Sequence, residues 1–329
     1  MNNKYNPALF WFAVLNAVTT FLLIGLGGLV TSHEAGMSVP DWPNSYGYNM
    51  FLFPIKDWIG GIFYEHTHRL LASVVGLLTT ILAVWLWLKD SRKWMQWLGI
   101  AAFLLVVVQG ILGGLRVDLR MAALGIFHGT IAQIFLILTC AIALCLSRWW
   151  TNSETEKTIA VPRGLRSHVL YVTLLIFVQL MIAATMRHQH AGLAITDFPL
   201  AYGKIWPATT PEAIAHYNAT RPPGTIGDSI TAFQVNLQMI HRCVAYAIFL
   251  GVIAAAFLAK KKLGAADGLT KFAWFWLALI IAQIGLGAWT VWSNKAADVT
   301  TLHVMVGASA LLTGALWWLA SARRTKLAA

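Results

Sequence analysis

Eight apolar stretches, each long enough to cross a lipid bilayer, dominate this chain of 329 residues. They cover residues 9–31, 64–88, 95–115, 124–147, 168–187, 236–259, 272–292 and 299–320. About 20 consecutive apolar residues span the hydrocarbon core of a bilayer. A segment in lipid must satisfy its backbone hydrogen bonds internally, so each stretch is predicted to form a helix. The sequence therefore predicts an all-α integral membrane protein with eight transmembrane helices.

Composition excludes several other classes of protein. Hydrophobic residues make up 58% of the chain and charged residues only 11%, which is far from the balance of a soluble domain. The net charge of +11 does not indicate nucleic-acid binding, because the basic residues are scattered between apolar stretches. Cys140, Cys145 and Cys243 lie inside apolar stretches and form no CxxC motif, so neither a disulfide framework nor a zinc site is indicated.

The distribution of Lys and Arg predicts the orientation of the chain. The two termini and the connections after every second apolar stretch carry most of these residues, although the other connections are longer in total. Cytoplasmic segments of membrane proteins are enriched in positive charge. We therefore expect a multi-pass protein of the cell inner (cytoplasmic) membrane, with both termini in the cytoplasm.

The chain also contains an internal repeat. Residues 35–47, AGMSVPDWPNSYG, align without a gap on residues 191–203, AGLAITDFPLAYG, which lie 156 positions later. Motifs farther along recur at offsets of 173 to 175, so the second copy has one insertion between Tyr202 and Phe233. Each copy contains an even number of spans. The repeat therefore predicts two tandem four-helix bundles related by a pseudo-twofold axis along the membrane normal.

Four histidines lie at matched positions in these two halves. His68, His128, His241 and His303 each come a few residues after the predicted outer end of a helix, roughly 6–10 Å below the outer boundary at 1.5 Å rise per residue. Ionisable groups inside a membrane are costly and tend to be functional. Two imidazoles that face each other across a helical bundle suit axial ligation of haem iron. We therefore expect haem sites toward the outer side of the membrane.

The two halves differ at one charged position. Glu65, three residues before His68, stands opposite Gln238 in the second half. At that spacing its carboxylate is on the same helix face as the histidine, where it is a candidate for catalysis, and pairing with Arg69 is an alternative. Arg69 and Arg242 directly follow the candidate ligands. Each is a candidate partner for a haem propionate, or else reaches toward lipid headgroups.

Taken together, these motifs resemble the haem A synthase family over nearly the whole chain. The shared features are the eight-helix duplication, ExxHR and HR at the starts of the second and sixth spans, the paired histidines, and the GMSVPDWPNSYG loop. The resemblance implies an oxidoreductase that converts haem O to haem A, the cofactor of haem–copper oxidases. In that reaction a ring methyl group is oxidised to a formyl group in two successive steps.

The resemblance also implies a role for each half. Residues 1–150 are expected to be the catalytic half, which binds the substrate haem O near His68 and His128 and carries Glu65 as the essential carboxylate. Residues 165–329 are expected to hold a permanent haem b on His241 and His303. The implied partners are haem O synthase, the terminal oxidase that receives haem A, and an electron carrier.

One departure from the family pattern lies in the first loop. Many members carry a cysteine pair where this chain has Val39 and Ser45. A redox relay through a loop disulfide is therefore not expected here. The paired Asp41 and Asp197 are expected to cap a short turn at the membrane surface rather than to take part in chemistry.

Other functions stay open at this point. A membrane cytochrome b that only carries electrons would usually place its haems near opposite faces of the membrane, and a transporter would also account for duplicated halves. The outer-loop residues His33, His188, His190 and His216 are candidates for binding a metal such as copper. The haem content of the purified protein discriminates among the main functions.

Overall fold

The computed structural model describes residues 5–151, 159–222, 224–225 and 229–328. In these ranges the regular secondary structure is helical, and eight helices are long and apolar enough to cross a membrane. The predictions of an all-α fold and of eight spans are therefore confirmed. The two β contacts in the described residues are isolated bridges, Ser45 with Tyr48 and Ala201 with Lys204.

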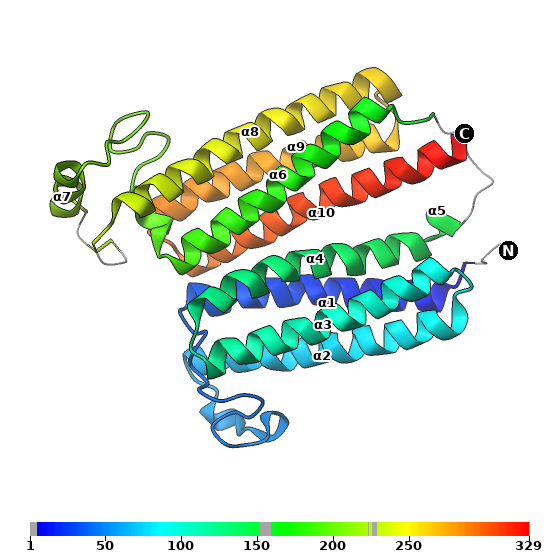
Figure 1. Cartoon of the computed structure of the whole chain (residues 1–329), viewed down its shortest axis with the longest axis horizontal. Helices are drawn as coiled ribbons and strands as arrows, with labels where there is room; N and C mark the ends of the chain where they lie inside the picture. The colour runs from blue at the N-terminus through cyan, green and yellow to red at the C-terminus, as the bar shows by residue number, and fades with distance from the viewer. Residues whose placement is uncertain (1–4, 152–158, 223, 226–228, 329) are drawn as a thin grey trace. The chain divides into compact units, whose positions relative to one another are not determined.

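Figure 1 shows the helices in chain order. The eight long ones are α1 (Pro7–Ser32), α2 (Gly61–Lys89), α3 (Lys93–Asp118), α4 (Ala122–Leu146), α6 (Arg163–His188), α8 (Ala232–Leu263), α9 (Gly268–Trp292) and α10 (Ala297–Ala328). The short elements are η1 (Met50–Leu52), η2 (Ile55–Asp57), α5 (Arg148–Thr151), η3 (Ala191–Leu193) and α7 (Pro211–Ala219).

Local sequence signals explain where several helices begin. The side chain of Asn6 accepts a hydrogen bond from the N–H of Leu9, and a proline follows it in the first turn of α1. Thr231 and Gln234 form a reciprocal capping box at the start of α8. Most helix ends lie a few residues beyond the apolar stretches, whereas α4 ends at Leu146, one residue before the predicted end, and α9 ends at Trp292 as predicted.

The first compact unit comprises residues 1–160 and 319–329. In it, α1 packs against α2 and α4, and α3 also packs against α2 and α4, so the four helices form a closed ring (Figure 1). Its core includes the buried side chains of Leu82, Leu86 and Met95. The ring supplies an interior in which polar side chains of different helices meet.

The second compact unit comprises residues 161–318. Here α8 packs against both α6 and α9. The indole N–H of Trp276 on α9 donates to the carbonyl of Ala310 on α10, at 2.8 Å, and Trp317 on α10 donates to Leu269 on α9, also at 2.8 Å. These bonds fix α10 against α9. The pseudo-twofold axis relating the halves stays a prediction.

Packing of α10 against α6 and α9 depends on Gly314. A methyl group there would stand 2.3 Å from Oγ1 of Thr173 and 2.7 Å from the buried ring of Trp276. We expect Gly314→Ala to lower the free energy of unfolding by about 1–3 kcal/mol, because neighbours in a packed core must shift. The control is Gly285→Ala on α9, where no atom lies within 4 Å. Thermal unfolding in detergent measures both variants, and equal midpoints would contradict the packing.

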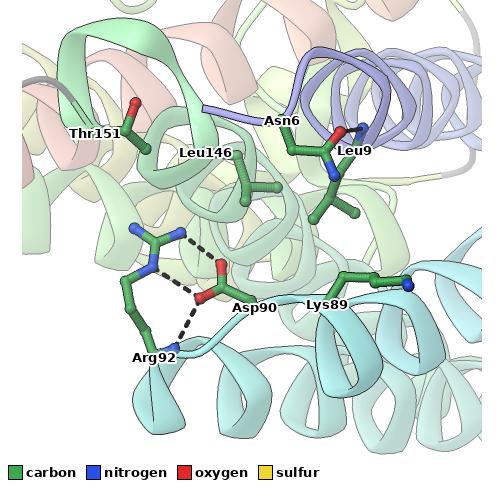
Figure 2. Close-up of a pocket in the computed structure, with 7 residues that line it drawn as sticks. All are labelled: Asn6, Leu9, Lys89, Asp90, Arg92, Leu146 and Thr151. Carbon is green, nitrogen blue, oxygen red and sulfur yellow. Dashed lines mark hydrogen bonds and ion pairs between the residues drawn. The ribbon is translucent and has the colours of Figure 1, made fainter. Parts of the chain in front are cut away.

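The end of the first unit distant from His68 contains a small cavity of about 200 Å³ (Figure 2). Asp90, one of its lining residues, accepts hydrogen bonds from Nε and Nη2 of Arg92, at 2.9 and 2.6 Å. Arg92 Nη1 also donates to the carbonyl of Cys145, at 2.9 Å. The Asp90–Arg92 pair therefore links the α2–α3 connection to the carbonyl of Cys145 on α4.

The predicted insertion in the second half contains α7, which lies beyond the N-terminal end of α8 in Figure 1. The ring of Tyr217 on α7 stacks on that of Tyr202, with centroids 3.6 Å apart. Burial raises the pKa of Tyr202 to about 12, so its hydroxyl stays protonated. The insertion therefore packs onto the loop before it.

Candidate functional site

The loop at residues 35–47 is built around the carboxylate of Asp41. Its two oxygens accept hydrogen bonds from the N–H groups of Tyr46, at 2.7 Å, and Gly47, at 2.8 Å. The hydroxyl of Tyr46 donates to the carbonyl of Ser38, at 2.6 Å. The expectation that Asp41 caps a turn is confirmed.

The loop of the second unit repeats these contacts 156 residues later. Asp197 accepts from the N–H groups of Tyr202, at 2.7 Å, and Gly203, at 2.9 Å. The Tyr202 hydroxyl donates to the carbonyl of Ala194. The sequence repeat is therefore also a repeat of local structure, and Asp197 has the same capping role.

Arg69 joins the first loop to α2. Its Nη1 donates to the carbonyls of Asp41, at 2.6 Å, and Asn44, at 3.0 Å, and its Nη2 donates to the carbonyl of Val39, at 3.0 Å. Backbone carbonyls of the loop therefore occupy much of this guanidinium group.

Arg242 makes the corresponding contacts in the second unit. Its Nη1 and Nη2 donate to the carbonyls of Leu200, at 2.9 Å, and Asp197, at 2.8 Å. Its guanidinium carbon also lies 5.4 Å from the ring centroid of Phe198. Both arginines hold a loop to a helix, and their binding of propionates stays a prediction.

Glu65 is buried, and both of its oxygens have partners. Oε1 lies 2.8 Å from Nη2 of Arg69, and Oε2 accepts the N–H of Val39, at 2.9 Å. In the second unit the side-chain oxygen of Gln238 accepts the equivalent N–H, that of Ile195, at 2.7 Å. The expected ion pair is present, and the two units use an acid and an amide for the same loop contact.

A second polar substitution accompanies Glu65. The fully buried His66 has its Nδ1 3.1 Å from the hydroxyl oxygen of Ser45, and its Nε2 has no hydrogen-bond partner among the described residues. The corresponding residues of the second unit are Met239 and Ala201, which are buried in an apolar cluster. The first unit is therefore more polar beneath its loop than the second unit.

His68 and His128 lie close together inside the first unit. Each residue is half-buried, but its Nδ1 is fully buried and has no hydrogen-bond partner in the described chain. The two rings are near enough to interact electrostatically. Gly27 on α1 lies close against His68, since a Cβ there would stand 3.2 Å from its Cε1, whereas a Cβ on Gly113 of α3 would be in ordinary contact with His128, 3.5 Å from its Cε1.

His241 and His303 form the matching pair in the second unit. Their Nδ1 atoms are also buried and unpaired within the described ranges, and the two rings interact electrostatically. A Cβ on Gly287 would stand 3.2 Å from Cε1 of His303. Gln179 donates to the carbonyl of His241, at 2.8 Å, while Gln283 Nε2 lies 3.5 Å from His303 Nε2, too far for a strong bond.

The two pairs fit axial ligands of haem iron. Buried polar atoms without a hydrogen-bond partner are rare in native proteins, and here they occur on all four histidines. Imidazole is a common axial ligand of haem, and bundle interiors are where such cofactors are held. The donor chemistry and the glycines beside three of the rings are both compatible with a haem in each unit.

The outer-loop histidines show no comparable arrangement. The ring of His33 stacks on Tyr64, with centroids 4.0 Å apart. The described residues contain no group of three or more His, Cys, Asp or Glu side chains placed to hold a metal ion, so His188, His190 and His216 belong to no such site. The alternative of an outer-loop metal centre gains no support.

Comparison with known protein families identifies the chain. The model of the COX15-CtaA family, described as cytochrome oxidase assembly protein, matches residues 48–316. The chain belongs to this family. The matched segment contains Glu65 and all four histidines of the two pairs, while the loop at residues 35–47 lies before it.

Curated relatives match this chain over most of its length. A protein of Alkalihalophilus pseudofirmus is 25% identical over 90% of this chain and 91% of its own. A protein of Shouchella clausii is 26% identical over 86% of each chain, and one of an Exiguobacterium species is 24% identical over 87% and 84%. All three are named haem A synthase.

Two features of the first unit were not predicted from the sequence. The contact between Ser45 and His66 joins a loop to a helix, and the sequence signal was the replacement of both residues in the second half. Arg116 on α3 lies next to the first histidine pair. The sequence signal for Arg116 was a charged residue near the end of an apolar stretch, at a position where the second half has the uncharged Thr290.

Proposed function

We propose that this protein is a haem A synthase, which oxidises a ring methyl group of haem O to the formyl group of haem A in two successive steps. The supporting comparisons are the family match and the names of the relatives. One observation carries the proposal for this chain: two histidine pairs, whose buried Nδ1 atoms have no partner among the described residues, occur in repeated surroundings, and Glu65, three residues before His68, is matched by the amide Gln238 before His241.

The two halves take different haems in this proposal. Residues 1–150 bind the substrate haem O through His68 and His128, which fix the position of the macrocycle in the first half. Residues 165–329 hold haem b through His241 and His303. When bound, haem b supplies a centre for electron transfer.

Glu65 moves protons in this scheme. The oxidation of a methyl carbon releases protons, and a carboxylate next to the first histidine pair is the group in this unit that accepts them. Arg69 and the N–H of Val39 orient its two oxygens. An amide at the same position, as in Gln238, makes the loop contact but accepts no proton.

Orientation in the membrane follows from the positive charges. We place both termini in the cytoplasm and the histidine pairs toward the outer side of the inner membrane. Consistent with this, Lys89, Arg92 and Lys93 lie at the end of the first unit away from His68. The partners are the enzyme that supplies haem O, the oxidase that receives haem A, and an electron carrier.

Haem extracted from the purified protein tests this function. We expect haem b together with haem O, its hydroxylated intermediate or haem A. Haem b alone would favour an electron-transferring cytochrome, since such a protein modifies no haem. A protein that contains no haem would favour a transporter.

A further inference from the structure

Arg116, in the last turn of α3, brings a positive charge to the first histidine pair. Its guanidinium group interacts electrostatically with His68, His128 and Glu65. Neither the sequence motifs nor the family resemblance assigns it a role. It is a half-buried charge at the position where the substrate is proposed to bind.

Among the described residues, the guanidinium of Arg116 has no counter-ion in direct contact. Its Nε is buried and has no hydrogen-bond partner among the described residues, and the ion pairs found in those residues involve other side chains. Glu65 interacts with it electrostatically, but the two oxygens of Glu65 already bind Arg69 and the N–H of Val39. A desolvated guanidinium without an anion is costly, so a ligand that supplies one would be stabilised here.

The loop is shaped to admit this group. A Cβ on Gly36 would stand 2.6 Å from Nη2 and 2.9 Å from Nη1 of Arg116, so a side chain at residue 36 would displace the guanidinium. In the second unit Thr290 replaces Arg116, but the side chain beside the equivalent Gly192 is that of Lys295. Both units therefore place a basic side chain next to this loop glycine, through guanidinium atoms of Arg116 in the first and through Cδ of Lys295, at 3.6 Å, in the second.

We infer that Arg116 binds a propionate carboxylate of the tetrapyrrole in the first unit. Propionates are the charged substituents at the edge of a haem, and the planar guanidinium fork matches a carboxylate with two parallel hydrogen bonds. The guanidinium of Arg69 already donates hydrogen bonds to loop carbonyls, whereas Nε of Arg116 has no hydrogen-bond partner among the described residues. The inference rests on the proposed function, because it assumes that the tetrapyrrole bound in the first unit is haem O.

The test compares haem O with its dimethyl ester, in which both carboxylates are neutral. The full-length protein, loaded with haem b and purified from a host that lacks haem O, is titrated with each compound and followed by absorbance. We expect Arg116→Gln to weaken binding of the free acid roughly tenfold and to leave binding of the ester unchanged. Arg116→Lys keeps the charge but loses the fork, so its affinity is expected to be intermediate.

Arg120→Gln is the matched control, because this exposed arginine lies in the turn just after α3. It is expected to bind both compounds as the wild type does. The absorption spectrum of haem b on His241 and His303 reports folding in every variant. If Arg116→Gln does not fold, the lysine variant provides the test. The inference is overturned if Arg116→Lys prefers haem O over its dimethyl ester as strongly as the wild type does.

The outcomes separate this inference from the function. An unchanged preference for the acid in Arg116→Gln, or equal losses for acid and ester, overturns the role of Arg116 even if haem A is formed. An acid preference that depends on Arg116, in a protein that forms no haem A, overturns the proposed function and leaves the role of Arg116 standing.

Discussion

Replacing Glu65 with glutamine is expected to slow the conversion of haem O by a factor of roughly 10² to 10⁴, the usual contribution of a general acid or base. The variant is expected to fold, because the second unit already has this amide in the same place. There Gln238 accepts the loop N–H of Ile195, at 2.7 Å, so an amide at position 65 can keep the bond to Val39. Haem extracted from membranes at successive times measures the rate.

The reciprocal change, Gln238→Glu, is the control for this prediction. It places a carboxylate four residues before Arg242, the spacing at which Glu65 pairs with Arg69, so the second loop keeps a partner. Conversion at the first pair is expected to continue at the wild-type rate. Full activity in Glu65→Gln would show that the carboxylate takes no part in the mechanism. Loss of the haem b spectrum in the same variant would show that Glu65 has a structural role.

Replacing His303 with alanine is expected to abolish binding of the proposed haem b, because one of its two proposed axial ligands is lost. His68→Ala is expected to retain that haem, since the residue belongs to the other pair. Absorption spectra of the reduced, purified proteins, with haem b measured per polypeptide, compare the two variants directly.

A histidine with a packing role provides the control for this comparison. Nε2 of His168 on α6 lies 2.8 Å from the carbonyl of Gly251 on α8, so this ring already has a hydrogen-bond partner. His168→Ala is expected to keep haem b at the wild-type level. Retention of haem b in His303→Ala, or its loss in His68→Ala, would contradict the assignment of the pairs.

The spans were predictable from the sequence because their signal is local. The apolar stretch at residues 9–31 became α1, Pro7–Ser32, and the stretch at 272–292 lies within α9, Gly268–Trp292. The capping role of Asp41 was also predictable, because the turn that it closes lies within a few residues.

Contacts across the fold were not predictable in the same way. Ser45 and His66 are 21 residues apart, and their bond depends on how the loop folds back onto α2. The position of Arg116 beside Gly36 depends on the packing of α3 in the ring. A single sequence showed that these residues differ between the halves, but not what they touch.

The hydrogen bond between the loop and position 65 comes from main-chain N–H, not from a side chain. Any residue except proline offers that donor, so Val39 and Ile195 serve equally well and the pocket accepts either glutamate or glutamine. Glutamate and glutamine codons differ by one base. A single base change can therefore exchange an acid for an amide at this position while the loop keeps its hydrogen bond.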